Sequence, residues 1–153
     1  MSPRQRQPER TPVLVSACLL GLPTRYDGSH CRREEVERLA EGCLLVPVCP
    51  EQLGGLPTPR EPAEINRGDG QDVLEARSAV TTRPGDDVTA QFLRGAEAVA
   101  QVAGVLNARR AILKEGSPSC GVACIRRNGQ EAPGMGVTTA LLLRKGLQVD
   151  GID

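Results

Sequence analysis

Three short apolar runs, each leading to a cysteine, stand out in the hydrophobic pattern of the chain. They are Val13–Ala17 before Cys18, Leu44–Val48 before Cys49, and Arg110–Leu113 before the loop that carries Cys120. Short apolar runs bounded by glycine and proline are typical of buried strands. We therefore predict three strands that each end close to one cysteine.

Apolar residues at helical spacing fill the segments between these strands. A helix is predicted over 32–42, with apolar residues at positions i, i+3 and i+4 and a glycine at its end. A long helix is predicted over 86–107, capped by one of its two leading aspartates, and another over 137–145. A final short strand is predicted over 148–152. The succession of strand, helix and strand indicates right-handed crossovers between parallel strands.

Three segments lack such a period. Residues 51–62 hold two glycines and three prolines, which predicts an ordered functional loop without regular structure. Around Gly68-Asp-Gly70, the flanking runs 63–66 and 72–77 predict a small hairpin outside the main sheet. Residues 1–12 are polar and carry three prolines, so we predict a flexible N-terminal tail.

The remaining elements predict one α/β domain over 13–153. A chain of 153 residues can remove roughly 70% of its unfolded-chain surface from water on folding, which is enough for one core. We expect a single compact three-layer domain with a short, mostly parallel sheet and helices on both faces.

The cysteines give the main clue to chemistry. Neighbouring parallel strands share one carboxyl edge, where α/β proteins place ligands, so Cys18, Cys49 and Cys120 are expected to converge there. No C-x-x-C pair is present, and local spacing alone specifies no metal. Three converging thiolates would leave one position of a metal open, as a catalytic metal requires. The alternative is that several cysteines are small buried apolar side chains.

Two polar residues flank candidate ligands. Glu51 lies two residues after Cys49, and Ser117 lies three residues before Cys120. A carboxylate can take a proton from water, and a hydroxyl can relay a proton or bind a polar substrate. The alternative for both is an ordinary loop role, as a solvated charge and a turn-forming serine.

Composition narrows the classes of partner. Lys plus Arg and Asp plus Glu each number 19, so net charge does not favour nucleic acid or an anionic membrane. Tyr26 and Phe92 are the only aromatic residues, too few for base-stacking platforms. No apolar run reaches about 18 residues and the N-terminus is polar, so we expect a cytoplasmic protein without a membrane partner. Six cysteines in a reducing compartment favour metal binding or reactive thiols over disulfides.

Several common enzyme motifs are absent. Cys18 and Arg25 are one residue too far apart for the phosphate-binding loop of tyrosine phosphatases. The only histidine, His30, lies next to Cys31 in a loop, and this pair is a weak basis for a cysteine protease. Neither a Walker loop nor a GxGxxG fingerprint is present, which removes the simplest nucleotide-binding hypotheses.

Four separated segments resemble the TudS-like thiouracil desulfidase family in order and spacing. They are VSACLLGLPTRYDG, VPVCPEQLGGLPTPREP, DVTAQFLRGAE and ILKEGSPSCG, and the resemblance covers roughly residues 13 to 145. It implies a 4Fe-4S cluster held by Cys18, Cys49 and Cys120, with a fourth iron that binds the sulfur of the substrate. Such an iron is soft enough to bind sulfur.

By the same resemblance, water replaces the sulfur of a thiolated uracil, such as thiouracil or 4-thiouridine monophosphate, and sulfide leaves without a redox step. Glu51 matches the acid/base carboxylate of the family and Ser117 its proton-relaying hydroxyl. Arg60 is expected to bind a nucleotide phosphate, and Ser119 to contact the substrate. The expected partner is a small thiolated pyrimidine, not a nucleic acid.

Two other functions stay open at this point. A non-catalytic metal- or cluster-binding sensor could use the same thiolates, and a thiol enzyme without a metal would need only one of them. Cys31 and Cys124 depart from the family pattern, and the segment after Gly121 follows no motif. The preferred thiolated base or nucleotide is therefore not predicted.

Overall fold

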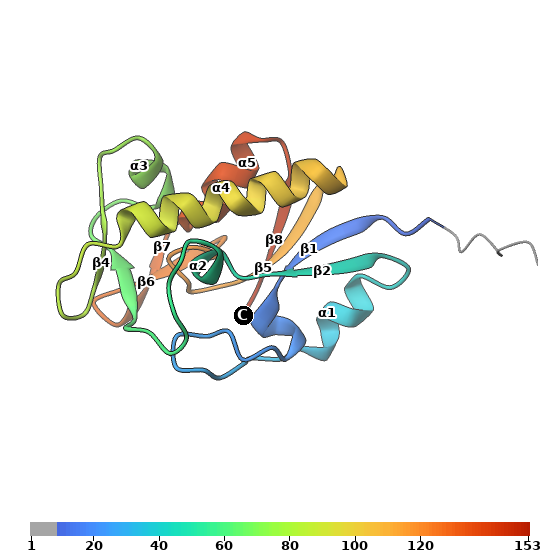
Figure 1. Cartoon of the computed structure of the whole chain (residues 1–153), viewed down its shortest axis with the longest axis horizontal. Coiled ribbons are helices and arrows are strands. Elements are labelled where there is room, and N and C mark those ends of the chain that lie inside the picture. The colour runs from blue at the N-terminus through green and yellow to red at the C-terminus, as the bar shows by residue number, and fades with distance from the viewer. Residues whose placement is uncertain (1–8) are drawn as a thin grey trace, which may run out of the picture.

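A four-stranded parallel sheet organises the fold in the computed structural model, which describes residues 9–153 (Figure 1). The order of its strands is β2-β1-β5-β8, and each neighbouring pair is parallel. The strands are β1 Pro12–Ser16, β2 Leu44–Val48, β5 Arg110–Lys114 and β8 Gln148–Ile152. These strands confirm the four predicted ones. Most of the predicted tail 1–12 lies outside the described residues, and β1 already includes its last residue.

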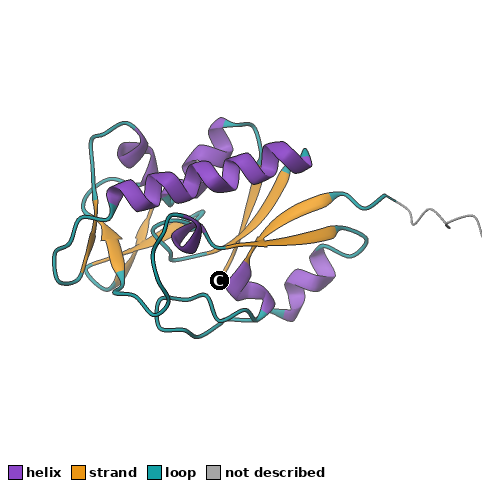
Figure 2. Ribbon diagram, viewed as in Figure 1, coloured by secondary structure: helices purple, strands orange, loops and turns teal. Residues whose placement is uncertain are grey.

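Helices cover both faces of this sheet, as Figure 2 shows. One face carries α1 Glu34–Leu39, and the other carries α4 Thr89–Leu106 and α5 Val137–Arg144. Side chains alternate along β1, so Val13 and Val15 pack in a cluster with Val36 of α1, whereas Leu14 packs in a cluster with Val99 of α4. The predicted three-layer α/β arrangement is confirmed.

The segment 63–82 differs from its prediction. Its strands are β3 Ala63–Ile65 and β4 Val80–Thr82, which pair antiparallel outside the main sheet. The predicted second strand at 72–77 was wrong, because α3 Gly70–Leu74 occupies that position. Asp69 caps this helix by accepting the N–H of Gln71 at 2.9 Å, and the carboxylate of Asp72 accepts the N–H of Asp69. This reciprocal capping favours a helix over a hairpin.

A second hairpin was missed by the sequence analysis. It consists of β6 Cys124–Arg127 and β7 Gln130–Pro133. Its turn, Asn128-Gly129, has φ values of 53° and 73°, the left-handed conformation that this residue pair favours in two-residue hairpins. The carboxylate of Glu64 accepts the N–H groups of Asn128 and Gly129, so the hairpin is attached to β3.

Short helical turns follow two of the strands. The 3₁₀ helix η1 Ala17–Leu20 follows β1, and α2 Pro50–Leu53 follows β2. Pro50 at the start of α2 suits a helix because its missing N–H would have no helical partner. The prediction that 51–62 contains no regular element was therefore wrong at its beginning.

Two glycines allow α2 to lie directly against α4. A Cβ atom on Gly54 would overlap the carbonyl oxygen of Gln91, and one on Gly95 would overlap the carbonyl oxygen of Pro50. Both obstacles are backbone atoms, which cannot move aside as a flexible side chain can. The position of α2, and of the residues at its first turn, therefore depends on the absence of side chains at these contacts.

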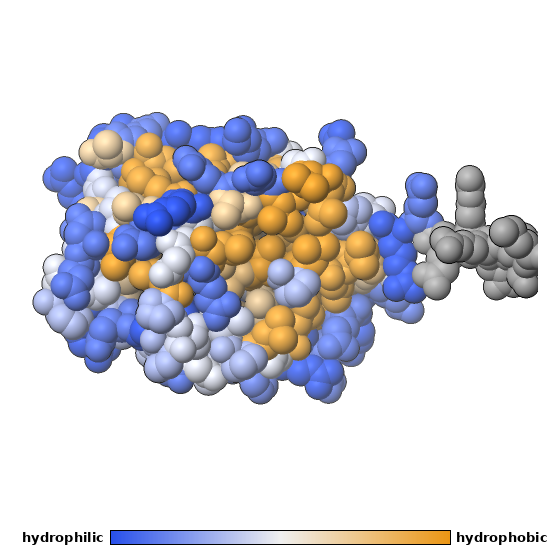
Figure 3. All heavy atoms as spheres, viewed as in Figure 1, coloured by the Kyte–Doolittle hydropathy of each residue, from blue (hydrophilic) through white to orange (hydrophobic). Residues whose placement is uncertain are grey.

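Apolar residues also reach the surface at one edge of the sheet. On the face seen in Figure 3 they gather over the end of α4 and the edge strand β2. Leu44 of β2 is 47% exposed, and Val105 near the end of α4 is 78% exposed. None of the helices in the described part of the chain is long and apolar enough to cross a membrane.

We predict that Gly95→Ala lowers the free energy of unfolding by about 1–3 kcal/mol, because the new methyl group forces α2 away from α4. Gly104→Ala, on the same helix, is the matched control, since a Cβ atom there meets no atom within 4 Å. It should be neutral or stabilising by up to about 1 kcal/mol. Urea unfolding followed by circular dichroism measures both. Equal effects of the two substitutions would contradict the proposed contact.

Candidate active site

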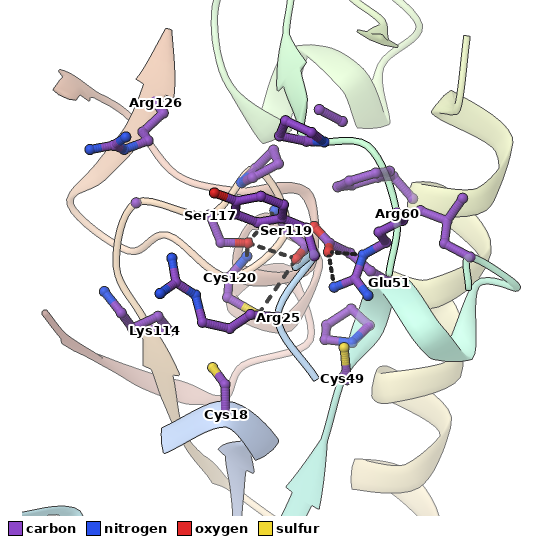
Figure 4. Close-up of a pocket in the computed structure, with 18 of the residues that line it drawn as sticks. Cys18, Arg25, Cys49, Glu51, Arg60, Lys114, Ser117, Ser119, Cys120 and Arg126 are labelled. Atoms are coloured by element: carbon purple, nitrogen blue, oxygen red, sulfur yellow. Dashed lines mark hydrogen bonds and ion pairs between the residues drawn. The ribbon is translucent and has the colours of Figure 1, made fainter. Parts of the chain in front are cut away.

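A cavity of about 560 Å³ lies at the carboxyl ends of β1, β2 and β5. Cys18, Cys49 and Cys120 all line it, together with Glu51 and Ser117. Figure 4 shows that the three cysteines come from three different elements and surround a common space. The convergence expected from the strand pattern is therefore present.

Each cysteine is delivered by a different local structure. Cys18 belongs to η1, which ends at Gly21 in a left-handed conformation with a φ of 91°. Cys49 occupies the N-cap position of α2, in extended conformation immediately after β2. Cys120 belongs to a tight loop after β5, and its carbonyl oxygen accepts the hydroxyl of Thr139 on α5 at 3.0 Å.

Ser117 organises the loop that carries Cys120. Its Oγ accepts the N–H groups of Ser119 and Cys120, both at 3.1 Å. Its carbonyl oxygen accepts the N–H of Gly121 at 2.9 Å. Glu115 holds the other side of the loop, because its carboxylate accepts the N–H groups of Val122 and Ala123. Ser117 is thus both a turn former and a lining residue.

The hydroxyls of Ser117 and Ser119 form a directed chain. Their Oγ atoms lie 2.9 Å apart, and Oγ of Ser119 lies 3.6 Å from Sγ of Cys120. Since Oγ of Ser117 already accepts two N–H groups, its proton is the one donated to Ser119, which in turn donates to the sulfur. Ser119 is only 2% exposed. Its predicted contact with a substrate stays a prediction.

Glu51 and Arg60 form an ion pair beside the cysteines, marked by dashed lines in Figure 4. Nε of Arg60 lies 2.8 Å and Nη2 lies 2.5 Å from Oε2 of Glu51. The side chains are 6% exposed for Arg60 and 15% for Glu51. The carboxylate of Glu51 is therefore fixed at the cavity wall by Arg60 and is not a solvated loop charge.

The remaining donors of Arg60 also reach protein atoms. Nη1 lies 2.8 Å from Oγ1 of Thr58 and 3.3 Å from the carbonyl oxygen of Pro57, and Nη2 lies 2.8 Å from the carbonyl oxygen of Thr24. Arg60 therefore joins the loop after η1 to α2. The phosphate-binding role that was expected for Arg60 stays a prediction.

Burial raises the pKa values of the three lining thiols. Burial is the largest cause for Cys18, and the neighbouring thiols of Cys31, Cys120 and Cys49 raise its pKa further. Burial raises the pKa of Cys120 to about 12, although the hydroxyls of Ser16 and Ser119 oppose the shift. Burial also raises the pKa of Cys49, opposed by the N–H of Gln52 and the charge of Arg60. The thiols therefore keep their protons at neutral pH until a cation replaces them.

The donor set fits a group with several metal atoms better than a single ion. Among the described residues, no three His, Cys, Asp or Glu side chains are grouped closely enough to hold one ion. A polynuclear iron cluster binds each thiolate at a different iron, so it suits sulfurs spread around a cavity. The described thiols outside this lining are Cys31, Cys43 and Cys124.

Four cations of the cavity wall were not identified as site residues from the sequence. They are Arg25, Arg83, Lys114 and Arg126, of which Figure 4 labels Arg25, Lys114 and Arg126, to the left of Arg60 in that view. Nζ of Lys114 lies 3.2 Å from the carbonyl oxygen of Glu115. Lys114 directly follows a predicted strand, which is a signal that sequence reasoning could have used, and Arg25 lies in the loop after Cys18. Arg126 lies on the missed hairpin and gave none.

Comparisons with known proteins agree on one family. The chain matches the model of a family described as 2-thiouracil desulfurase over residues 13–151, a range that includes every residue named above as lining the cavity. The uncharacterized protein YbbK of Bacillus subtilis (strain 168) is 45% identical over 140 residues, which are 90% of this chain and 93% of YbbK.

A solved structure is similar along nearly the whole chain. It is described as a 4Fe-4S-dependent thiouracil desulfidase, TudS, and it is 45% identical to this chain with a TM-score of 0.78. The match covers 93% of this chain and 91% of TudS. The chain is therefore similar to TudS both in fold and in sequence.

Proposed function

Because the chain belongs to the 2-thiouracil desulfurase family, we propose that it is an iron-sulfur-dependent desulfidase. Its substrate is a thiolated uracil, as the free base or as 4-thiouridine monophosphate, and the products are the oxygen-containing base and sulfide. The observation that carries this proposal is the cavity in which Cys18, Cys49 and Cys120 meet beside Glu51 and Ser117.

Cys18, Cys49 and Cys120 are the residues that would hold a 4Fe-4S cluster, the cofactor of the related TudS. When bound, the cluster would supply a soft Lewis acid that suits a thiocarbonyl sulfur. Hydroxyls next to Cys120 would support its thiolate form, because a hydrogen bond to the charged form stabilises it.

The reaction is balanced as a hydrolysis. One water adds to the thiocarbonyl carbon, the C–S bond breaks, and hydrogen sulfide leaves while a carbonyl remains. No electron is gained or lost. Glu51 takes one proton from the attacking water, and the new hydroxyl group loses the second proton as the carbonyl forms. Both protons reach the departing sulfur, one of them relayed by the hydroxyl of Ser117, so that Glu51 and Ser117 end the reaction in their starting forms.

The cavity wall carries carboxylates as well as cations, and its cations offer contacts for an anionic substituent on the substrate. Arg25 and Lys114 line the cavity, and Lys114 also contacts the carbonyl oxygen of Glu115 and the carboxylate of Asp153. The donors of Arg60, in contrast, are occupied by protein acceptors. A nucleotide phosphate would be attracted to guanidinium and ammonium groups at this wall. We therefore assign Arg25 and Lys114 as phosphate contacts, in place of the role first expected of Arg60.

We propose a small-molecule substrate in the cytoplasm, with no nucleic acid or membrane partner. The equal numbers of acidic and basic residues and the presence of only two aromatic residues support this choice.

Anaerobic reconstitution with iron and sulfide tests the function directly. We expect about four irons per chain, a visible cluster spectrum, and sulfide release from 2-thiouracil and from 4-thiouridine monophosphate. Sulfide is measured colorimetrically after removal of excess reagent. A loaded protein that releases no sulfide from either compound would favour the sensor, and failure to bind iron would exclude the proposed cofactor.

Cysteine substitutions test the ligand set. Cys18→Ser, Cys49→Ser and Cys120→Ser should each lose most of the bound iron, because each removes one thiolate from the set. Cys43→Ser and Cys124→Ser are matched controls outside the cavity lining and should keep the wild-type iron content. Iron analysis and the visible spectrum measure this. A thiol enzyme without metal requires that two of the first three substitutions be harmless.

Glu51→Gln and Ser117→Ala test the acid/base roles. Each should lower kcat by about 10²–10⁴-fold, the usual contribution of general acid–base catalysis, while the iron content persists. Glu61→Gln is the matched control, because this exposed carboxylate lines the same cavity and is not part of the proposed chemistry. Activity that survives in Glu51→Gln would refute the role of Glu51, and iron loss there would make Glu51 structural.

A further inference from the structure

The two oxygens of the Glu51 carboxylate have different surroundings. Oε2 accepts both hydrogen bonds from Arg60, at 2.8 and 2.5 Å. No hydrogen bond from a described residue reaches Oε1. Among the described residues, Oγ1 of Thr138 is the only buried side-chain polar atom without a partner, so Oε1 is accessible from the cavity that Glu51 lines.

Arg60 has no donor left for another partner. A guanidinium carries five N–H groups. Two of them point to Oε2 of Glu51, two to Thr58 and Pro57, and one to the carbonyl oxygen of Thr24. With a side chain that is 6% exposed, Arg60 cannot bind a phosphate without breaking one of these hydrogen bonds.

The acceptors of Arg60 come from separate parts of the site. Thr24 lies in the loop after η1, and its carbonyl oxygen also lies 3.8 Å from Sγ of Cys49. The backbone N–H of Arg60 donates to the carbonyl oxygen of Tyr26 in the same loop at 2.7 Å. Arg60 thus fixes the distance between this loop and the first turn of α2.

From this geometry we propose that Arg60 is a positioning residue that gives the two oxygens of the Glu51 carboxylate different roles. It holds Oε2 with a two-donor fork and thereby presents Oε1 as the atom that takes the proton from water. This inference rests on the proposed function, because it assigns the reacting oxygen within it. Lys cannot replace Arg60, since an ammonium cannot reproduce the planar fork.

The test compares 4-thiouridine with 4-thiouridine monophosphate, two compounds that differ only in the phosphate. With both compounds, Arg60→Lys should lower kcat by a similar factor, about 10- to 100-fold, with little change in KM. Arg25→Ala is the contrasting variant, because the loss of a phosphate contact should raise KM for the nucleotide alone. If Arg60→Lys instead raises KM only for the nucleotide, Arg60 binds phosphate and the positioning role is wrong.

A double substitution shows whether Arg60 acts through Glu51. In Glu51→Gln, the residual rate constant for sulfide release in a single turnover should fall no further when Arg60→Lys is added. Additive losses would mean that Arg60 works independently of Glu51, which overturns the proposal. All rates are expressed per bound cluster. If Arg60→Lys has the same rate per cluster as the wild type, the positioning role of Arg60 is also wrong.

Two further measurements separate positioning from a merely structural effect. Methylguanidinium added to Arg60→Ala should restore part of kcat, and it should restore nothing in the double variant that also carries Glu51→Gln. In the unloaded protein, thermal unfolding of both single variants and the double variant should show coupling between the two residues. This coupling is measurable even if the wild type desulfurates neither compound. That result would refute the proposed function, but it would leave the coupling between Arg60 and Glu51 to be tested.

Discussion

The site depends first on the parallel pairing of β1 with β2 on one side and with β5 on the other. Ser16 is level with Val48, and Val15 is level with Ile112, so the three strands reach the same edge of the sheet. Parallel pairing cannot be made by a tight turn, and the crossovers bring together residues that are distant in sequence. Cys18 and Cys120 share one cavity for this reason, although about a hundred residues separate them.

The strand ends set the position of the site only approximately, and close backbone contacts refine it. Gly54 and Gly95 let α2 touch α4, which sets the position of Cys49 and Glu51 at the start of α2. Gly136 acts similarly at α5, where a Cβ atom would overlap the backbone of Ser119 next to Cys120. Two of the three cysteine-bearing segments are thus held by helix contacts that tolerate no side chain, which limits their movement relative to the sheet.

Sequence reasoning succeeded where a local pattern decides the structure. Three of the four strands and the convergence of three cysteines follow from short apolar runs with cysteines after them, and the long helix follows from apolar residues at helical spacing. It failed for α3, because the reciprocal capping by Asp69 and Asp72 outweighed the turn signal of the two glycines. The hairpin at Asn128-Gly129 had a clear signal that was overlooked. The partners of Arg60 had none, because Thr24 lies 36 residues away and only the folded chain brings it into reach.

The opposite charges of Glu51 and Arg60 also affect the pKa values of the neighbouring thiols. A lone carboxylate in this wall would make thiolates costly, because the charge of Glu51 raises the pKa values of Cys49 and Cys120. The guanidinium of Arg60 opposes it by lowering the pKa of Cys49. The pair therefore places a carboxylate oxygen in the cavity while adding little net charge next to the sulfurs. An apolar wall would leave the pKa values of the thiols equally free of a nearby negative charge, but it would lack the carboxylate that is proposed here as the proton acceptor.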